Sequence, residues 1–253
     1  MHPNPEEKCC SILLHALKGS TGPHPHRGIA TLTYVLSGEA RHFDSAGHQA
    51  VVRSGGVQWM KAGNGVVHDE ILTHDSERSD MLTHGFQFWI NLPSEIKKEK
   101  PDYRALQAEE VPTYAMPHDA GTIKIILGSM GSLHSPIPVF ARAFLYHVRL
   151  EVGKSTVLNF NEGEEVAAFL PTQSMVLNGK DCDAGEFIEF DRKEGEITLQ
   201  NHLTDIADVL VFGGEPYTEP IVAEGPFVMN SKAEIADAYR DYFAGKYGEL
   251  GKS

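Results

Sequence analysis

Cysteine, tryptophan and long apolar runs are scarce in this sequence. Three cysteines (Cys9, Cys10 and Cys182) and two tryptophans occur among its 253 residues. Three cysteines are too few for a disulfide framework, and no two of them have the CxxC spacing of a metal site. The apolar runs are far too short to span a membrane, and no apolar core of a secretory signal lies near the N-terminus. We therefore expect a soluble protein with reduced thiols, in the cytoplasm or, in a eukaryote, also in the nucleus.

Positive charge is also in short supply. The chain has 22 Lys and Arg against 35 Asp and Glu, a net charge of −13 with histidine neutral. Nucleic-acid binding depends on Lys and Arg that neutralise phosphates. We therefore expect no direct binding to nucleic acid and none to an anionic membrane surface, so that any role in gene regulation would require a protein partner.

Signals for β-strands dominate what is present. Short runs of Val, Ile, Thr and aromatic residues alternate with glycine-containing turns, a pattern typical of a β-sandwich or barrel. The expected strands cover residues 31–36, 50–53, 57–61, 122–127, 141–151, 155–160, 166–170, 187–190, 197–201 and 209–212. A polar stretch at 93–117 interrupts this pattern, and we expect one short helix there, around residues 103–107.

The two halves of the chain resemble each other. Segment 54–60 aligns with segment 183–189, and each follows a polar hairpin turn and a short extended segment. This similarity favours a duplicated β-barrel. We expect one domain at residues 1–112 and a second at 113–253.

A single long helix is predicted near the C-terminus. Ser231 and Glu234 form a capping box, and an apolar face follows, made of Ile235, Ala238, Tyr239, Tyr242 and Phe243. Spacings of three and four residues place these side chains on one side of a helix. Gly245 is a suitable residue to end this helix.

The strongest chemical signal is a set of histidines. His24 and His26 are two residues apart, and so are His68 and Glu70. In an extended segment, such pairs point to the same face. If the two segments are neighbours, three imidazoles and one carboxylate converge, a donor set suited to iron and, less specifically, to Mn, Ni, Cu or Zn. Alternatively, the HxH spacing arises by chance and His68 with Glu70 forms a surface ion pair. Of the other histidines, His84 is expected nearest to this site.

Four segments resemble motifs of the pirin family, in the same order along the chain. They are 24–28 (HPHRG) with 33–38, then 57–70, 87–93 and 225–230. The resemblance implies an all-β fold of two tandem cupin (jelly-roll-like) β-barrels with a C-terminal α-helix. It also implies a metal, most often Fe(II), bound in the first barrel by His24, His26, His68 and Glu70. The second barrel, which contains neither HxH nor HxE, would be free of metal. Ala30 stands where many members have glutamate, and Asp69 adds a charge beside His68.

Two functions agree with this resemblance. The first is a quercetin 2,3-dioxygenase-like oxidoreductase that cleaves a flavonol with dioxygen. Its catalytic residue would be Glu70, as a metal ligand that can also take the substrate proton. Phe86, Phe88 and Trp89 would line the aromatic pocket, although alternation along a strand sends only one face inward and the others would be core. The second is a non-enzymatic, iron- or redox-sensing co-regulator of transcription that acts through protein partners.

Overall fold

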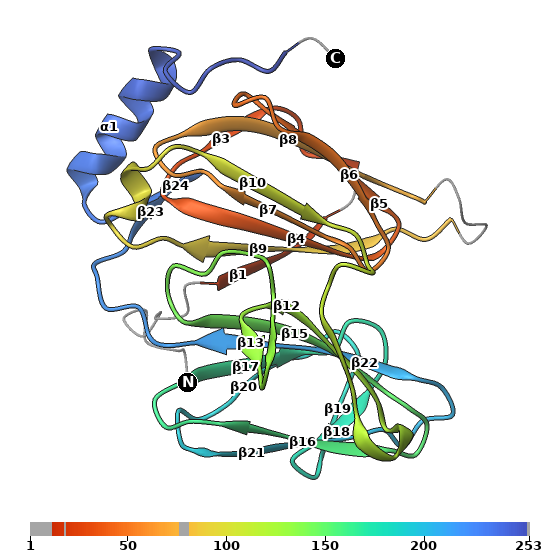
Figure 1. Ribbon diagram of the computed structural model, residues 1–253. Helices are drawn as coiled ribbons and strands as arrows, with labels where there is room; N and C mark the ends of the chain where they lie inside the picture. The colour runs from red at the N-terminus through yellow and green to blue at the C-terminus, as the bar shows by residue number, and fades with distance from the viewer. Residues whose placement is uncertain (1–11, 18, 76–80, 252–253) are drawn as a thin grey trace. The chain divides into compact units, whose positions relative to one another are not determined.

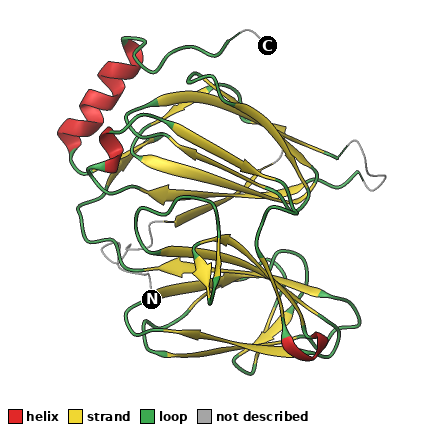
Figure 2. Cartoon of the chain, viewed as in Figure 1, coloured by secondary structure: helices red, strands yellow, loops and turns green. Residues whose placement is uncertain are grey.

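The computed structural model describes residues 12–17, 19–75 and 81–251 (Figure 1). Nearly all regular structure in these ranges is β-strand, with one α-helix close to the C-terminus (Figure 2). Two compact units are present: residues 111–217 form one, and the described residues between 12 and 110 form the other together with 218–251. The domain boundary expected at residue 112 remains a prediction, but the C-terminal segment from residue 218, which we placed in the second domain, groups with the N-terminal strands.

The N-terminal unit contains two antiparallel sheets. The first has the order β1 (Ile12–Leu17), β9 (His84–Asn91), β4 (Ile29–Ser37), β7 (Val57–Lys61) and β10 (Asp102–Leu106). The second has the order β2 (Gly19–Ser20), β8 (Val66–Thr73), β5 (Glu39–Asp44) and β6 (Gln49–Arg53), with β3 (His24–His26) also paired to β8. Pairing of β3 with β8 joins the two segments that carry the predicted ligands.

The unit of residues 111–217 has the same kind of architecture. A six-stranded sheet has the order β11 (Thr113–Ala115), β12 (Gly121–Leu127), β15 (Ala143–Leu150), β22 (Ala207–Gly214), β17 (Glu165–Phe169) and β20 (Phe187–Glu189). A second sheet has the order β16 (Ser155–Phe160), β21 (Gly195–Gln200), β18 (Met175–Leu177) and β19 (Lys180–Cys182), and a small hairpin pairs β13 (Ser129–Met130) with β14 (Leu133–His134). Aliphatic and aromatic side chains from both larger sheets form one buried core, which stabilises the unit.

The helix expected around residues 103–107 was wrong. This segment is strand β10, which pairs antiparallel with β7, and the Tyr103 hydroxyl donates a 2.8 Å hydrogen bond to Gln58 Oε1. Tertiary pairing therefore overrides the weak local preference for a helix. Two short 3-10 turns occur instead: Ile96–Lys98 within the polar stretch and Pro117–Asp119 at its end.

The C-terminal helix is confirmed. After the hairpin of β23 (Val222–Glu224) and β24 (Phe227–Met229), helix α1 (Lys232–Phe243) begins behind Ser231, whose side chain accepts a hydrogen bond from the Glu234 backbone N–H. Gly245 follows the C-cap with φ +73, a conformation that favours glycine. Ile235 is buried against the hairpin. No helix in the described part of the chain has the length and apolar character to cross a membrane.

The internal similarity corresponds to a shared turn. Gly55 and Gly185 have φ values of +84 and +85, and a strand begins two residues after each of them. The backbone N–H groups of Gly56 and Glu186 close these turns on the carbonyls of Arg53 and Asp183. The structural equivalence therefore pairs Gly55 with Gly185, one residue away from the sequence alignment.

Candidate metal centre

Strands β3 and β8 bring three histidines together. His24 lies directly opposite His68 in the antiparallel register, and His26 projects to the same face as His24. Ring centroids are 4.4 Å apart for His24 and His68, 4.8 Å for His24 and His26, and 5.0 Å for His26 and His68. One nitrogen from each ring lies within 4.8 Å of the other two. The first local pair and His68 of the second thus form one cluster.

Backbone carbonyls fix the tautomers of two of these rings. His24 Nδ1 is 2.7 Å from the Gly22 carbonyl oxygen, and His26 Nδ1 is 3.1 Å from that of Pro226. Since a carbonyl can only accept, each Nδ1 carries the hydrogen and each Nε2 keeps a lone pair. Such outer hydrogen bonds orient the imidazoles of metal sites.

Burial keeps the imidazoles of His26 and His68 neutral. Burial, reinforced by the nearby His24, lowers the pKa of His26 to about 3. Burial, and then the neighbouring histidines His26, His24 and His42, lowers the pKa of His68 well below its usual value. His26 and His68 are therefore unprotonated at neutral pH, the form that binds a metal ion.

The cluster fits a transition metal. His26 Nε2 is buried and has no hydrogen-bond partner, an unfavourable state for a polar atom that a bound ion could relieve. His24 Nε2 and His68 Nε2 are 3.0 Å apart. Two nitrogens at about 2.1 Å from a common ion, at a right angle to each other, would be about 3.0 Å apart. Imidazole donors suit Fe, Ni, Cu and Zn alike.

Glu70 lies beside this cluster and is held by two donors. Its Oε1 accepts a 2.9 Å hydrogen bond from the Thr33 hydroxyl, and its Oε2 accepts one from Gln87 Nε2. Trp89 Nε1 donates to Gln87 Oε1 over 3.0 Å and so fixes the orientation of that amide. The His68 Nδ1 atom is 4.0 Å from Glu70 Oε2. Glu70 therefore groups with His68 and His42, and it would have to exchange a hydrogen bond to join His24 and His26 as a ligand.

His42 is a residue of the site that the sequence reasoning missed. It lies opposite Glu70 on β5, is 2% exposed and stacks on Tyr103 with ring centroids 4.3 Å apart. Its Nε2 is 3.2 Å from Asp44 Oδ2, and His48 Nδ1 is 2.9 Å from the same oxygen. The sequence does contain a signal for His42, because His42 and Asp44 are two polar residues with a spacing of two within one strand.

Only one face of β9 contributes to the site. Gln87 and Trp89 point toward the histidines, and the Trp89 ring meets His26 edge-on with centroids 4.9 Å apart. Phe86 and Phe88 lie on the opposite face and are buried there. His84 contacts Phe86, with centroids 4.6 Å apart, and belongs to neither group of candidate ligands. The further histidine of the site is therefore His42, with its ring centroid 5.4 Å from that of His68, and not His84 as expected.

The two flanking residues noted in the sequence are not part of the cluster. Asp69 accepts a hydrogen bond from the Ser20 hydroxyl over 3.2 Å, which directs its carboxylate away from the imidazoles. Ala30 is buried on β4, and alternation places it on the face opposite Thr33.

Two antiparallel double-sheet units, with a histidine cluster in one of them, define a bicupin, a β-protein of two tandem cupin domains. The chain matches the Pirin family over residues 5–90 and the Pirin C-terminal cupin domain over residues 145–248. It therefore belongs to the pirin family, which confirms the resemblance found in the sequence motifs.

Three relatives illustrate the similarity. The chain is 35% identical over 240 residues to a pirin-like protein of Caulobacter vibrioides, covering 90% of this chain and 81% of that one. It is 32% identical over 226 residues to a Pseudomonas aeruginosa protein provisionally named a quercetin 2,3-dioxygenase, covering 89% of this chain and 78% of that one. The crystal structure of a quercetin 2,3-dioxygenase from Acinetobacter baumannii superposes with a TM-score of 0.85 at 30% identity, covering 95% of this chain and 87% of that one.

Proposed function

We propose that this protein is an iron-dependent dioxygenase that cleaves a flavonol-type aromatic substrate. The observation that carries this proposal is the cluster of His24, His26 and His68, in which the buried His26 Nε2 has no hydrogen-bond partner and which lies beside the oriented carboxylate of Glu70. Similarity to the quercetin 2,3-dioxygenase of Acinetobacter baumannii supports the choice of substrate class.

The three imidazoles hold the metal in this proposal. A bound ion would polarise an enol or phenol oxygen of the substrate and make the reaction with dioxygen accessible. His24 and His26 are kept in orientation by their Nδ1–H bonds to the carbonyls of Gly22 and Pro226. His68 is buried at 0% exposure, which excludes water from that side of the cluster.

Glu70 would accept the proton that the substrate hydroxyl releases. The Thr33 hydroxyl and the Gln87 amide hold its carboxylate in place, so its orientation does not depend on the substrate. Release of the Gln87 hydrogen bond would free Oε2 to act as a base or as a ligand. The Trp89 ring, edge-on to His26, offers an apolar surface for the substrate.

The test uses metal-loaded protein and quercetin. Protein reconstituted with Fe(II) under anaerobic conditions is mixed with quercetin in air, and the visible absorbance of quercetin and dioxygen uptake are followed together. We expect loss of absorbance with matching dioxygen consumption, and none with His24→Ala. The matched control is His202→Ala, which removes an exposed histidine.

The same assay separates the enzyme from the alternative function. If protein that retains one iron per chain consumes neither quercetin nor dioxygen, the enzymatic proposal fails. The iron-sensing role through protein partners would then become the better explanation of the same cluster.

A further inference from the structure

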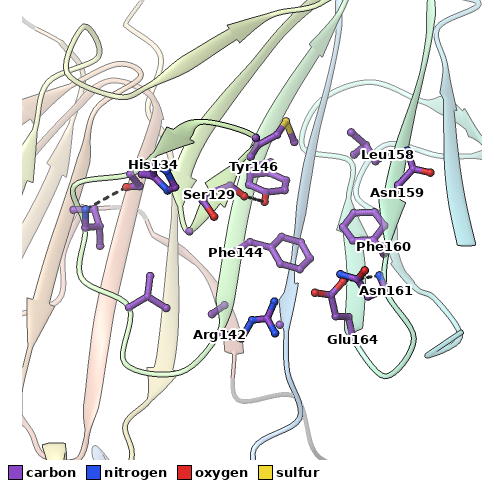
Figure 3. A pocket seen from close by; sticks show the side chains of 18 of the residues that line it. Ser129, His134, Arg142, Phe144, Tyr146, Leu158, Asn159, Phe160, Asn161 and Glu164 are labelled. Carbon is purple, nitrogen blue, oxygen red and sulfur yellow. Dashed lines mark hydrogen bonds between the residues drawn. The ribbon is translucent and has the colours of Figure 1, made fainter. Parts of the chain in front are cut away.

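The unit of residues 111–217 contains a cavity that the proposed chemistry does not use. Its volume is about 750 Å³, and it lies between β15, β16 and the segment 128–142 (Figure 3). Sites for small organic molecules usually measure about 300 to 1,000 Å³. The cavity is therefore large enough for a ligand of one to three fused or linked rings.

Aromatic rings form its walls. Phe144 stacks on Tyr146 with centroids 5.0 Å apart and planes 23° apart, and on Phe160 with 5.4 Å and 26°. Phe144 and Tyr146 come from β15, and Phe160 comes from β16 (Figure 3). The three rings pack against one another and so form one continuous apolar wall, and a planar ligand can lie against the side of it that lines the cavity.

The polar groups of the lining are balanced in charge. Arg142 pairs with Glu215 over 2.7 Å, and Glu164 accepts a 2.8 Å hydrogen bond from the Asn161 backbone N–H. The Tyr146 hydroxyl donates to the Ser129 carbonyl over 2.6 Å and keeps its lone pairs as acceptors. Burial, and then the charge of Glu164, raises the pKa of Tyr146 to about 12, so this hydroxyl stays neutral.

These groups favour one class of ligand. The guanidinium that could attract an anion is already paired, whereas Glu164 and the Tyr146 hydroxyl can each accept a hydrogen bond. A ligand that matches this lining is uncharged, planar and carries a hydroxyl group. Among the described residues, the clusters of candidate metal ligands involve only residues 24, 26, 42, 68 and 70, so binding here needs no metal.

We propose that this cavity binds a small uncharged phenol that packs against the aromatic wall of Phe144, Tyr146 and Phe160 and donates its hydroxyl to Glu164 or Tyr146. Binding is independent of the histidine cluster, and therefore the protein has a second small-molecule site besides the one used by the proposed dioxygenase. Because the metal is not involved, this inference stands or falls separately from the proposed function.

The probe is 2-naphthol, a planar phenol without a pair of oxygens that could chelate metal. It is titrated into the full-length, metal-stripped protein and followed by calorimetry. We expect saturable binding to one site per chain. Phe160→Leu, which removes one ring of the aromatic wall, should weaken binding about fivefold to tenfold. The matched control is Phe187→Leu, since Phe187 is 53% exposed and lies outside the cavity lining.

A second variant guards against loss of fold. Glu164→Gln does not alter the packed walls, and it should weaken 2-naphthol severalfold while leaving 2-methoxynaphthalene, which cannot donate a hydrogen bond, unchanged. Thermal unfolding confirms that each variant is folded. His24→Ala should bind 2-naphthol as the parent does. The proposal is overturned if saturable binding is absent, or if His24→Ala abolishes it while Phe160→Leu leaves it intact.

Discussion

Replacing Glu70 by glutamine tests the centre of the site, because it removes a negative charge with little change in size. The Trp89 indole fixes Gln87 Oε1, so Gln87 Nε2 must remain directed at residue 70. The new amide can therefore place only its oxygen toward Gln87. Its nitrogen then faces Thr33, whose hydroxyl can turn round and accept a hydrogen bond. The network survives the substitution, but without charge.

The size of the effect follows from these two hydrogen bonds. A bond to a charged group contributes about 1.5–3 kcal/mol to stability, against about 0.5–1.5 kcal/mol for a neutral one. Weakening the two hydrogen bonds costs roughly 2 kcal/mol of stability. Part of this loss is offset because the variant no longer has to bury a charged carboxylate. We expect a net loss of about 1 kcal/mol in the free energy of unfolding. A lost general base lowers the rate about 10²- to 10⁴-fold, whereas metal affinity falls less because three imidazoles remain.

Three measurements on Glu70→Gln separate these effects: urea unfolding, metal content after reconstitution with Fe(II), and the aerobic quercetin assay. The matched control is Glu249→Gln, which changes an exposed carboxylate. A variant that keeps its metal and oxidises quercetin at the parent rate would refute the role of Glu70 as a base. Complete loss of metal would refute the expectation that the three imidazoles suffice to hold it.

Four further outcomes are expected. His24→Ala should abolish tight metal binding, as elemental analysis of the reconstituted protein would show, because it removes one of the three clustered imidazoles. The parent should bind one transition metal per chain, and a stoichiometry of two would contradict a metal-free second unit. Ser231→Ala should lower stability by about 1 kcal/mol in urea unfolding, because the N-cap of α1 is lost. Burial lowers the pKa of Lys97 from 10.5 to about 8. Between these two pH values the unfolded chain binds more protons than the folded chain, so the contribution of Lys97 to the free energy of unfolding rises with pH from about 8 to 10.5. Lys97→Met should remove that rise and the exposed Lys98→Met should not, as unfolding at pH 7.5 and pH 10 would measure.

Local patterns predicted most of the strands and the helix, because each depends on residues close together in the chain. The expected strands at 57–61 and 155–160 have the observed bounds, and Ser231 caps α1 as its capping box indicates. The segment 103–107 was misread because its conformation depends on pairing with β7, some forty residues earlier.

Of the candidate site, too, only the features that depend on local spacing could be predicted from the sequence. The spacing of two residues predicted which histidines share a face, but their approach depends on the pairing of β3 with β8. His42 escaped notice because its position opposite Glu70 comes from the register of β5 and β8, which no local motif encodes. Gln87 and Thr33 were likewise hidden, since they reach Glu70 from another sheet.

The segment from residue 218 completes the histidine site, which explains why two distant motifs matter to the same centre. The Pro226 carbonyl orients His26, and Arg27 pairs with Asp241 of α1 over 2.9 Å. Gly28 has φ +83, and a Cβ atom at this position would overlap the Val228 carbonyl oxygen. Any larger residue at position 28 would therefore push the 226–229 segment away and release His26 from its carbonyl. The HPHRG motif thus supplies both His24 and His26, two of the proposed ligands, and the close contact that holds His26 in place.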